Sequence, residues 1–203
     1  MNIIKRYYDK FKIANPKNTE IKFLVIIIVL VIMIFNGTSN FNFSWDILIS
    51  MGAFIVSLTL HEVAHGYVAH LFGDDTAKNE GRLTLNPIKH IDIVGFILPI
   101  MLILSGVPYV IGWAKPVPVR FDKLRPNRLG LFCVAIAGIV VNFFIAFVSL
   151  IILRYRLFGN DINNIFNTIT LYLYVINLTL AFFNLIPVTP LDGGRIVYSL
   201  SGK

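Results

Sequence analysis

Five apolar runs separated by polar loops dominate the pattern of this 203-residue chain. The runs cover about 22–36, 47–72, 93–111, 129–153 and 165–187. Because about 20 apolar residues in a helix span the hydrocarbon core of a bilayer, we interpret each run as a membrane-embedded helix. The pattern therefore predicts an all-α membrane protein, built as a multi-pass helical bundle.

The composition supports this class. Hydrophobic residues make up 56% of the chain and charged residues only 14%, and the mean hydropathy is +0.74, whereas soluble domains are about 25% charged. The net charge of +7 is typical of basic loops beside membrane helices, so we expect contact with the lipid bilayer and no nucleic-acid partner. Cys133 is the single cysteine, which excludes an intramolecular disulfide and a thiolate cluster. A bound metal would therefore need nitrogen and oxygen ligands.

The N-terminal residues are strongly basic. Six lysines and arginines lie in the first 22 positions, and no small-residue cleavage site follows the first apolar run. We expect residues 1–22 to form a basic cytosolic segment and residues 23–203 to form one intramembrane domain, with the first run retained as an anchor.

Glu62 is the one carboxylate in the body of an apolar run, and His61 and His65 flank it. An ionised group at this depth costs about 2.5–3.5 kcal/mol on insertion scales, so it indicates a functional site. The stretch 61–65 has the H-E-x-x-H form, in which a helix places both imidazoles on one face. This spacing suits one zinc ion, and Glu62 could then act as the catalytic base that takes a proton from the water that zinc activates.

A catalytic zinc usually takes a third protein ligand, and the chain offers several candidates. His70 lies about 140° around the helix from the motif, so it points away. His90 and Asp92 lie in the next loop and could fold back. Asp192 lies in 184–195, where two prolines and two glycines suit irregular backbone that lines a cavity. We favour Asp192, and the alternative is an Asp-Gly-Gly turn at the water interface.

Five stretches resemble the site-2 protease family of intramembrane zinc metalloproteases, in its compact form without an added regulatory domain. They are HEVAH at 61–65, GRLTLNPIKHID at 81–92, GWAKPVPV at 112–119, AGIVVN at 137–142 and NLIPVTPLDGGR at 184–195. H-E-x-x-H in a membrane helix and a later LDGG form the specific combination.

The resemblance covers about 44–195 and implies a role for each matching residue. His61, His65 and Asp192 would be the ligands of one Zn²⁺ per chain, Glu62 the catalytic base, and Asn142 a polar residue that lines the active site. The chain departs from the family pattern at Ile139, where the family usually has proline.

A zinc ion shared by the second and fifth runs constrains the topology, because His61 and Asp192 must reach one depth. Both runs should therefore point in the same direction, so one of the two runs between them must dip into the membrane and return. Loop 112–128 carries five basic residues and one acid, which predicts a cytosolic position. Run 93–111, interrupted by two prolines, is then the re-entrant segment. We expect a plasma-membrane protein whose N-terminus and active-site mouth face the cytosol.

The alternating stretch 117–121 suits a short edge strand, and an interfacial loop is the alternative. Through Val117 and Val119, such a strand could hold an unwound substrate by main-chain pairing. The polar side chains of Asn142 and Asn184 could help water to reach the site. The predicted function is an intramembrane zinc metalloprotease that hydrolyses a peptide bond within or near the transmembrane segment of a membrane-protein substrate, as in regulated intramembrane proteolysis.

Two other functions could use the same cluster. A divalent-cation transporter could carry a metal through it, although the apolar runs show no duplicated halves. A non-catalytic binder could keep the ligands and sequester membrane proteins. The sequence shows no obvious recognition domain, so we expect regulation by an unidentified partner or by the shape of the substrate.

Overall fold

The computed structural model describes residues 45–92, 114–161 and 164–201. All of them belong to one compact unit, residues 43–96 and 112–203. The basic segment 1–22 and the apolar runs 22–36 and 93–111 lie outside the described residues, so the boundary at residue 22 and the re-entrant segment stay predictions.

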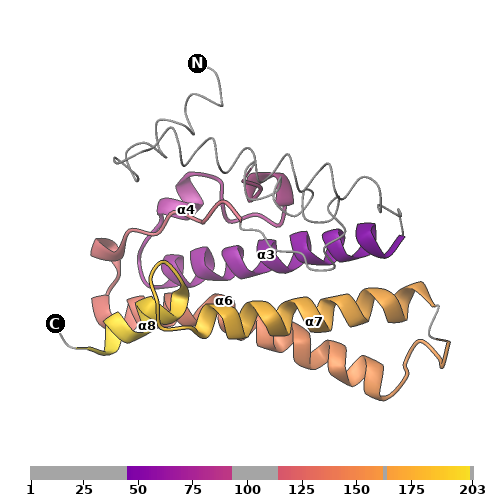
Figure 1. Ribbon diagram of the computed structural model, residues 1–203. Helices are drawn as coiled ribbons and strands as arrows, with labels where there is room; N and C mark the ends of the chain where they lie inside the picture. Colours follow the sequence, from indigo (N-terminus) through magenta and orange to yellow (C-terminus); the bar gives the residue numbers. More distant parts are fainter. Residues whose placement is uncertain (1–44, 93–113, 162–163, 202–203) are drawn as a thin grey trace, which may run out of the picture. The chain divides into compact units, whose positions relative to one another are not determined.

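Three long helices make up most of the described unit (Figure 1): α3 Trp45–Leu71, α6 Asn127–Arg154 and α7 Ile165–Leu185. Each is long and apolar enough to cross a membrane. They match the second, fourth and fifth predicted runs to within two residues at every end. The prediction of an all-α membrane protein is confirmed.

The remaining elements are short. Helix α4 Thr76–Asn79 and the 3₁₀ turn η1 Pro87–Lys89 follow α3, the 3₁₀ turn η2 Phe121–Lys123 precedes α6, and α8 Asp192–Leu200 follows α7.

Helices α3 and α7 run in the same direction and α6 runs in the opposite one (Figure 1). The C-terminal ends of α3 and α7 therefore lie at the same end of the bundle as the start of α6. We call this the site end. The parallel course of the second and fifth runs, inferred from a shared metal ion, is confirmed.

The edge strand considered for 117–121 is not formed. Residues 115–120 have no regular secondary structure, and η2 follows at once. The nearest β pairing in the described residues is one isolated antiparallel bridge between Ile91 and Ala114. Pro118 has no N–H to donate to a ladder, which works against a strand here. The alternative interpretation, a loop, is correct.

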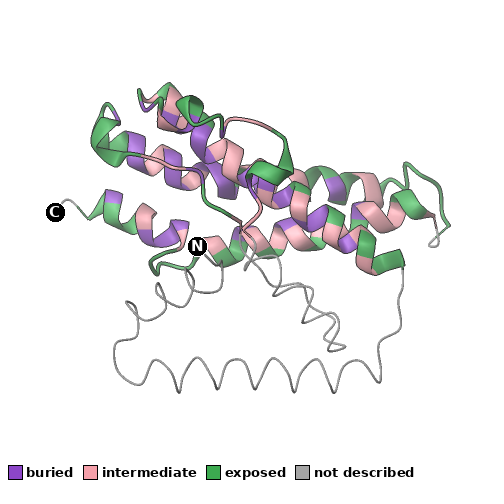
Figure 2. Ribbon diagram, turned by 90° about the horizontal axis from the view of Figure 1, so that it is seen from above, coloured by how far each residue is buried: buried purple, intermediate pink, exposed green. Residues whose placement is uncertain are grey.

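The inner faces of the long helices are buried and their outer faces are exposed (Figure 2). At the site end, Ala69 of α3, Leu131 and Val134 of α6, and Leu124 from the preceding loop form a buried apolar cluster. On the outside, Phe144, Phe147 and Phe182 are 59–65% exposed, which suits helices that face lipid and not water.

Buried polar side chains recur seven residues apart on each long helix. They are Ser50 and Ser57 on α3, Asn142 and Ser149 on α6, and Thr170 and Asn177 on α7. Asn177 Nδ2 donates a hydrogen bond of 2.7 Å to Ser57 Oγ and so links α3 to α7. Polar bonds of this kind help to associate helices in membranes, where there is little hydrophobic force between them.

Candidate metal centre

Helix α3 brings two imidazoles together. His61 and His65 lie four residues apart, each is 5% exposed, and their Nε2 atoms are 3.0 Å apart. The rings meet edge to face, at 84°. The i, i+4 spacing predicted from the motif is therefore present, and both Nε2 atoms point to one place.

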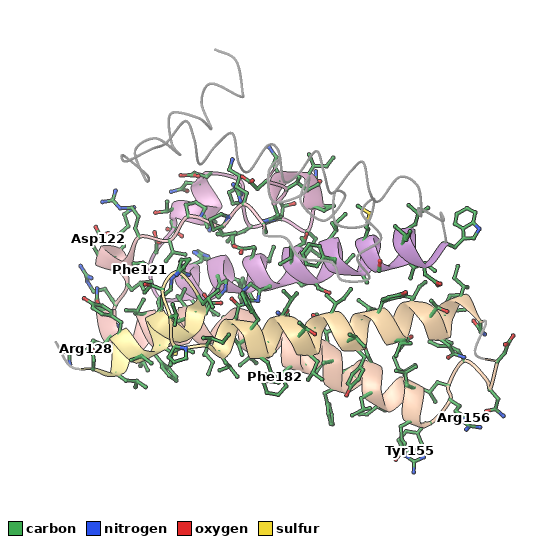
Figure 3. The ribbon with its side chains drawn as sticks, viewed as in Figure 1. Phe121, Asp122, Arg128, Tyr155, Arg156 and Phe182 are labelled. Atoms are coloured by element: carbon green, nitrogen blue, oxygen red, sulfur yellow. The ribbon has the colours of Figure 1, made fainter. Side chains whose placement is uncertain are left out.

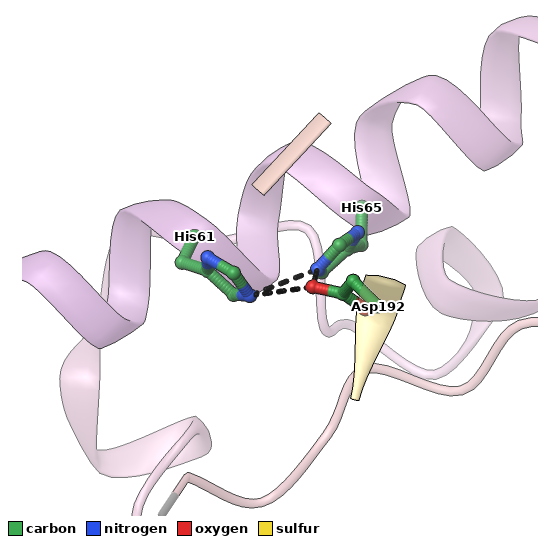
Figure 4. Close-up of side chains that lie close together, drawn as sticks. All are labelled: His61, His65 and Asp192. Carbon is green, nitrogen blue, oxygen red and sulfur yellow. Dashed lines mark hydrogen bonds and ion pairs between the residues drawn. The ribbon is translucent and has the colours of Figure 1, made fainter. Parts of the chain in front are cut away.

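Asp192 reaches the same place from the other end of the chain. The segment after α7 turns back through Pro187 and Pro190, and α8 begins at Asp192. Asp192 Oδ2 lies 3.2 Å from His61 Nε2 and 3.1 Å from His65 Nε2 (Figure 4). The carboxylate is buried, at 4% exposure. The structure thus assembles the three residues that the sequence singled out as metal ligands.

The donor set fits a zinc ion. His65 Nδ1 lies 2.6 Å from Val134 O, so Nδ1 carries the proton and the Nε2 of a neutral ring presents a lone pair. That lone pair faces Asp192 Oδ2, a buried atom with no hydrogen-bond partner among the described residues. A cation between these acceptors satisfies them all, and tetrahedral zinc holds its ligand atoms about 3.3 Å apart. The observed separations of 3.0–3.2 Å are close to this value.

Neighbouring groups orient each ligand. Asn142, which is fully buried, has its amide 3.1 Å from His61 Nδ1, and its Oδ1 has no hydrogen-bond partner among the residues that the structure describes. A half turn of the amide lets Oδ1 accept the His61 Nδ1 proton, the usual support of a metal-binding histidine. Arg195 donates to Asp192 Oδ1 at 3.1 Å and leaves Oδ2 for the metal. Helix α6 is continuous through Ile139 and Asn142, where the chain departs from the family pattern.

Glycines make room for this convergence. A β-carbon at Gly138 of α6 would lie 2.6 Å from His65 Nε2, and one at Gly193 would lie 2.4 Å from the carbonyl oxygens of Leu185 and Ile186. The first glycine lets α6 approach the ligands, and the second lets α8 fold tightly onto the end of α7.

Glu62 follows His61 on α3 and is partly buried. Its Oε2 accepts a hydrogen bond of 2.7 Å from the Val117 N–H. Val117 is therefore next to the expected catalytic base, in a loop and not in a strand, and its role in substrate binding stays a prediction. Val119 packs against the apolar cluster at the site end.

The other candidate residues lie outside the ligand group. His70 pairs with Asp75, and His90 is buried, with Nε2 2.8 Å from Thr84 O. Asp92 does not belong to the group either. Asn184 Nδ2 donates to Leu180 O in its own helix at 3.0 Å.

Two buried charged residues were missed by the sequence analysis. Asp74 is 0% exposed and Arg82 is 6% exposed, and both hold the loop that carries Val117. Charged residues in a polar loop are normally exposed to solvent, so the identity of these two residues did not indicate that they are buried. The one available clue to Arg82 was its place in the GRLTLNPIKHID stretch.

Two histidines of an H-E-x-x-H helix and a distant aspartate, in a bundle of membrane-length helices, form a candidate zinc site. The family model of peptidase family M50 matches residues 155–203, which include Asp192. Over 152 residues the chain is 45% identical to "Putative zinc metalloprotease YwhC" of Bacillus subtilis. The matched residues make up 72% of this chain and 66% of that protein. The chain is 34% identical over 185 residues to zinc metalloprotease MJ0392 of Methanocaldococcus jannaschii, covering 91% of this chain and 41% of that protein. No solved structure matches the chain.

The chain belongs to peptidase family M50, the site-2 protease family that its motifs indicated. It spans less than two thirds of the length of these two relatives.

Proposed function

We propose that the chain is an intramembrane zinc metalloprotease that hydrolyses a peptide bond within or near the transmembrane segment of a membrane-protein substrate. The observation that carries this proposal is the meeting of His61, His65 and Asp192 at one buried point, next to the carboxylate-bearing residue Glu62. Regulated intramembrane proteolysis, with a partner or the shape of the substrate limiting access, is the form of the reaction that we propose.

When bound by His61, His65 and Asp192, zinc supplies a Lewis acid that polarises the scissile carbonyl and lowers the pKa of water toward about 7. Glu62 takes the proton of the attacking water and passes it to the leaving amine. Val117 N–H occupies Oε2 of Glu62 and leaves Oε1 available for this proton. Val134 O and Asn142 keep the two imidazoles in the orientation that the ligand set needs.

The charge distribution supports a cytosolic site end. Lys78, Arg120, Lys123, Arg125 and Arg128 lie in the loops and helix termini at this end. Arg154 and Arg156 lie at the opposite end, as Figure 3 shows for Arg128 and Arg156. Cytosolic segments beside membrane helices carry the excess of basic residues. We therefore propose that the site end faces the cytosol and that the protein resides in the plasma membrane.

The position of Val117 supports a way to hold the substrate. A membrane-spanning helix must unwind before its amide groups reach a metal centre. The segment 115–120 lacks regular secondary structure and lies next to Glu62. This supports the proposal that an unwound substrate pairs with main-chain groups near Val117 and Val119 other than the Val117 N–H, which is bonded to Glu62.

The test compares wild type with Glu62→Gln in liposomes that also contain a single-pass membrane protein with a reporter tag. We expect both to hold about one zinc ion per chain and only the wild type to release a cleaved fragment. Zinc flux into the liposomes without cleavage would favour a transporter, and bound substrate without flux or cleavage would favour a binder.

A further inference from the structure

We propose that Arg82 is a positioning residue for Glu62, and that it acts through the peptide group between Pro116 and Val117. This inference rests on the proposed proteolytic function. Arg82 Nη2 donates to Lys115 O at 2.8 Å and to Pro116 O at 3.3 Å, while Val117 N–H donates to Glu62 Oε2 at 2.7 Å. The Pro116 carbonyl and the Val117 N–H belong to one planar amide. A guanidinium therefore contacts the oxygen of that amide, and a carboxylate contacts its N–H.

Arg82 is buried although its side chain is charged, which is unusual for an arginine. The side chain is 6% exposed, and within the described part of the chain no ion pair joins it to a carboxylate, while its Nε is buried without a hydrogen-bond partner. A buried cation without compensation is costly. Arg82 donates to the carbonyl oxygens of Lys115 and Pro116, and the carboxylate of Glu62 lies on the far side of the second of these peptide groups.

Local structure fixes both ends of this connection. Gly81 has a φ of 62°, and Arg82 N–H bonds to Ala77 O at 2.8 Å, which sets the backbone of Arg82 just after α4. On the other side, Gly66 lets Val117 lie directly on α3, because a β-carbon at position 66 would be 2.8 Å from Val117 Cγ1. The amide between Pro116 and Val117 is thus held at a fixed position beside Glu62.

The arrangement has a chemical consequence. A cation bonded to a carbonyl oxygen polarises the amide, and the N–H of a polarised amide makes a stronger hydrogen bond. That bond keeps Oε2 of Glu62 occupied and restricts the side chain to the orientation in which Oε1 can accept a proton. Without Arg82, the peptide group and the carboxylate would both gain freedom, and a base displaced by about 1 Å can lose about 100-fold in rate.

The experiment measures steady-state cleavage by Arg82→Gln and Arg82→Lys in the full chain. The matched control is Arg125→Gln, because Arg125 also donates to two backbone carbonyls of this loop, Asp122 O at 2.7 Å and Leu124 O at 2.8 Å. We expect Arg82→Gln to lower kcat by about 10- to 100-fold with KM and zinc content unchanged. Arg82→Lys should recover part of the loss, and Arg125→Gln should stay within about 3-fold of wild type. Equal losses in Arg82→Gln and Arg125→Gln, or loss of zinc together with kcat, would overturn the proposal.

A second readout does not depend on activity. In protein labelled with ¹⁵N-valine, the amide proton of Val117 should resonate downfield and exchange slowly, because a carboxylate accepts it. We expect Arg82→Gln to move this resonance upfield and to speed its exchange, and Arg125→Gln to leave it in place. An unmoved resonance in Arg82→Gln overturns the role of Arg82 even in an active protease. A moved resonance in a chain that cleaves nothing supports the Arg82–Glu62 connection and counts against the proposed function.

Discussion

Gly138 of α6 faces His61 of α3 so closely that a β-carbon at position 138 would lie 2.5 Å from His61 Cε1. The two helices can meet at the metal ligands only because this position lacks a side chain. The ligand geometry therefore depends on α6, although α6 supplies no ligand.

We predict that Gly138→Ala displaces both imidazoles and weakens zinc binding by at least about 10-fold, as loss of ligand support does in other metal sites. Competition with a chelator measures the affinity. The control is Gly52→Ala on α3, where a β-carbon would have nothing within 4 Å. Equal zinc affinity in the two variants would show that α6 does not constrain the ligands.

Two buried asparagines allow a matched test of ligand orientation. Asn142 and Asn177 are both fully buried, and within the described parts of the chain both have an Oδ1 without a hydrogen-bond partner and only Asn142 contacts a ligand histidine. We expect Asn142→Leu to lower zinc affinity by about 10- to 100-fold and Asn177→Leu to leave it unchanged. Similar affinities in the two variants would remove Asn142 from the support of His61.

Asp74 gives a prediction about acid stability. Burial acts to raise the pKa of this carboxyl, but hydrogen bonds from the Thr76 side chain and from the Arg120 and Thr76 N–H groups outweigh it, so the pKa lies below its ordinary value. The unfolded chain, with a pKa of about 3.9, therefore takes up the proton first as the pH falls. The contribution of Asp74 to stability is present above about pH 4 and is lost as the pH falls through the native pKa.

Thermal unfolding in detergent between pH 7 and pH 3 measures this effect. Asp74→Asn should destabilise the protein at pH 7 by about 1–3 kcal/mol, because it weakens the bonds to Thr76 and Arg120. The variant should also lose less stability than wild type on acidification below pH 4. Parallel pH profiles for the two proteins would contradict the lowered pKa.

The sequence predicts the features that are local along the chain. The lengths of the apolar runs predicted α3, α6 and α7. The four-residue spacing of His61 and His65 predicted that both rings lie on one face of a helix. The prolines and glycines around Asp192 indicated irregular backbone that lines a cavity, although they did not reveal that α8 begins at that residue. The requirement that His61 and Asp192 share one ion gave the common direction of α3 and α7.

The features that the sequence does not predict depend on partners far along the chain. A strand at 117–121 needed a neighbouring strand, but Val117 N–H bonds to Glu62 and Arg120 N–H bonds to Asp74, 55 and 46 residues away. Alternation of residue types cannot identify such carboxylate partners. The burial of Arg82 follows from the same fold of the loop over α3.

The most direct test of the metal centre is zinc analysis of the purified chain in wild type, Asp192→Asn and Glu62→Gln. We predict about one zinc ion per chain in wild type and in Glu62→Gln, and little or none in Asp192→Asn, because Asp192 Oδ2 is the third atom of the ligand group. Wild-type protein purified without bound zinc, or Asp192→Asn that binds zinc as tightly as wild type, would contradict this account.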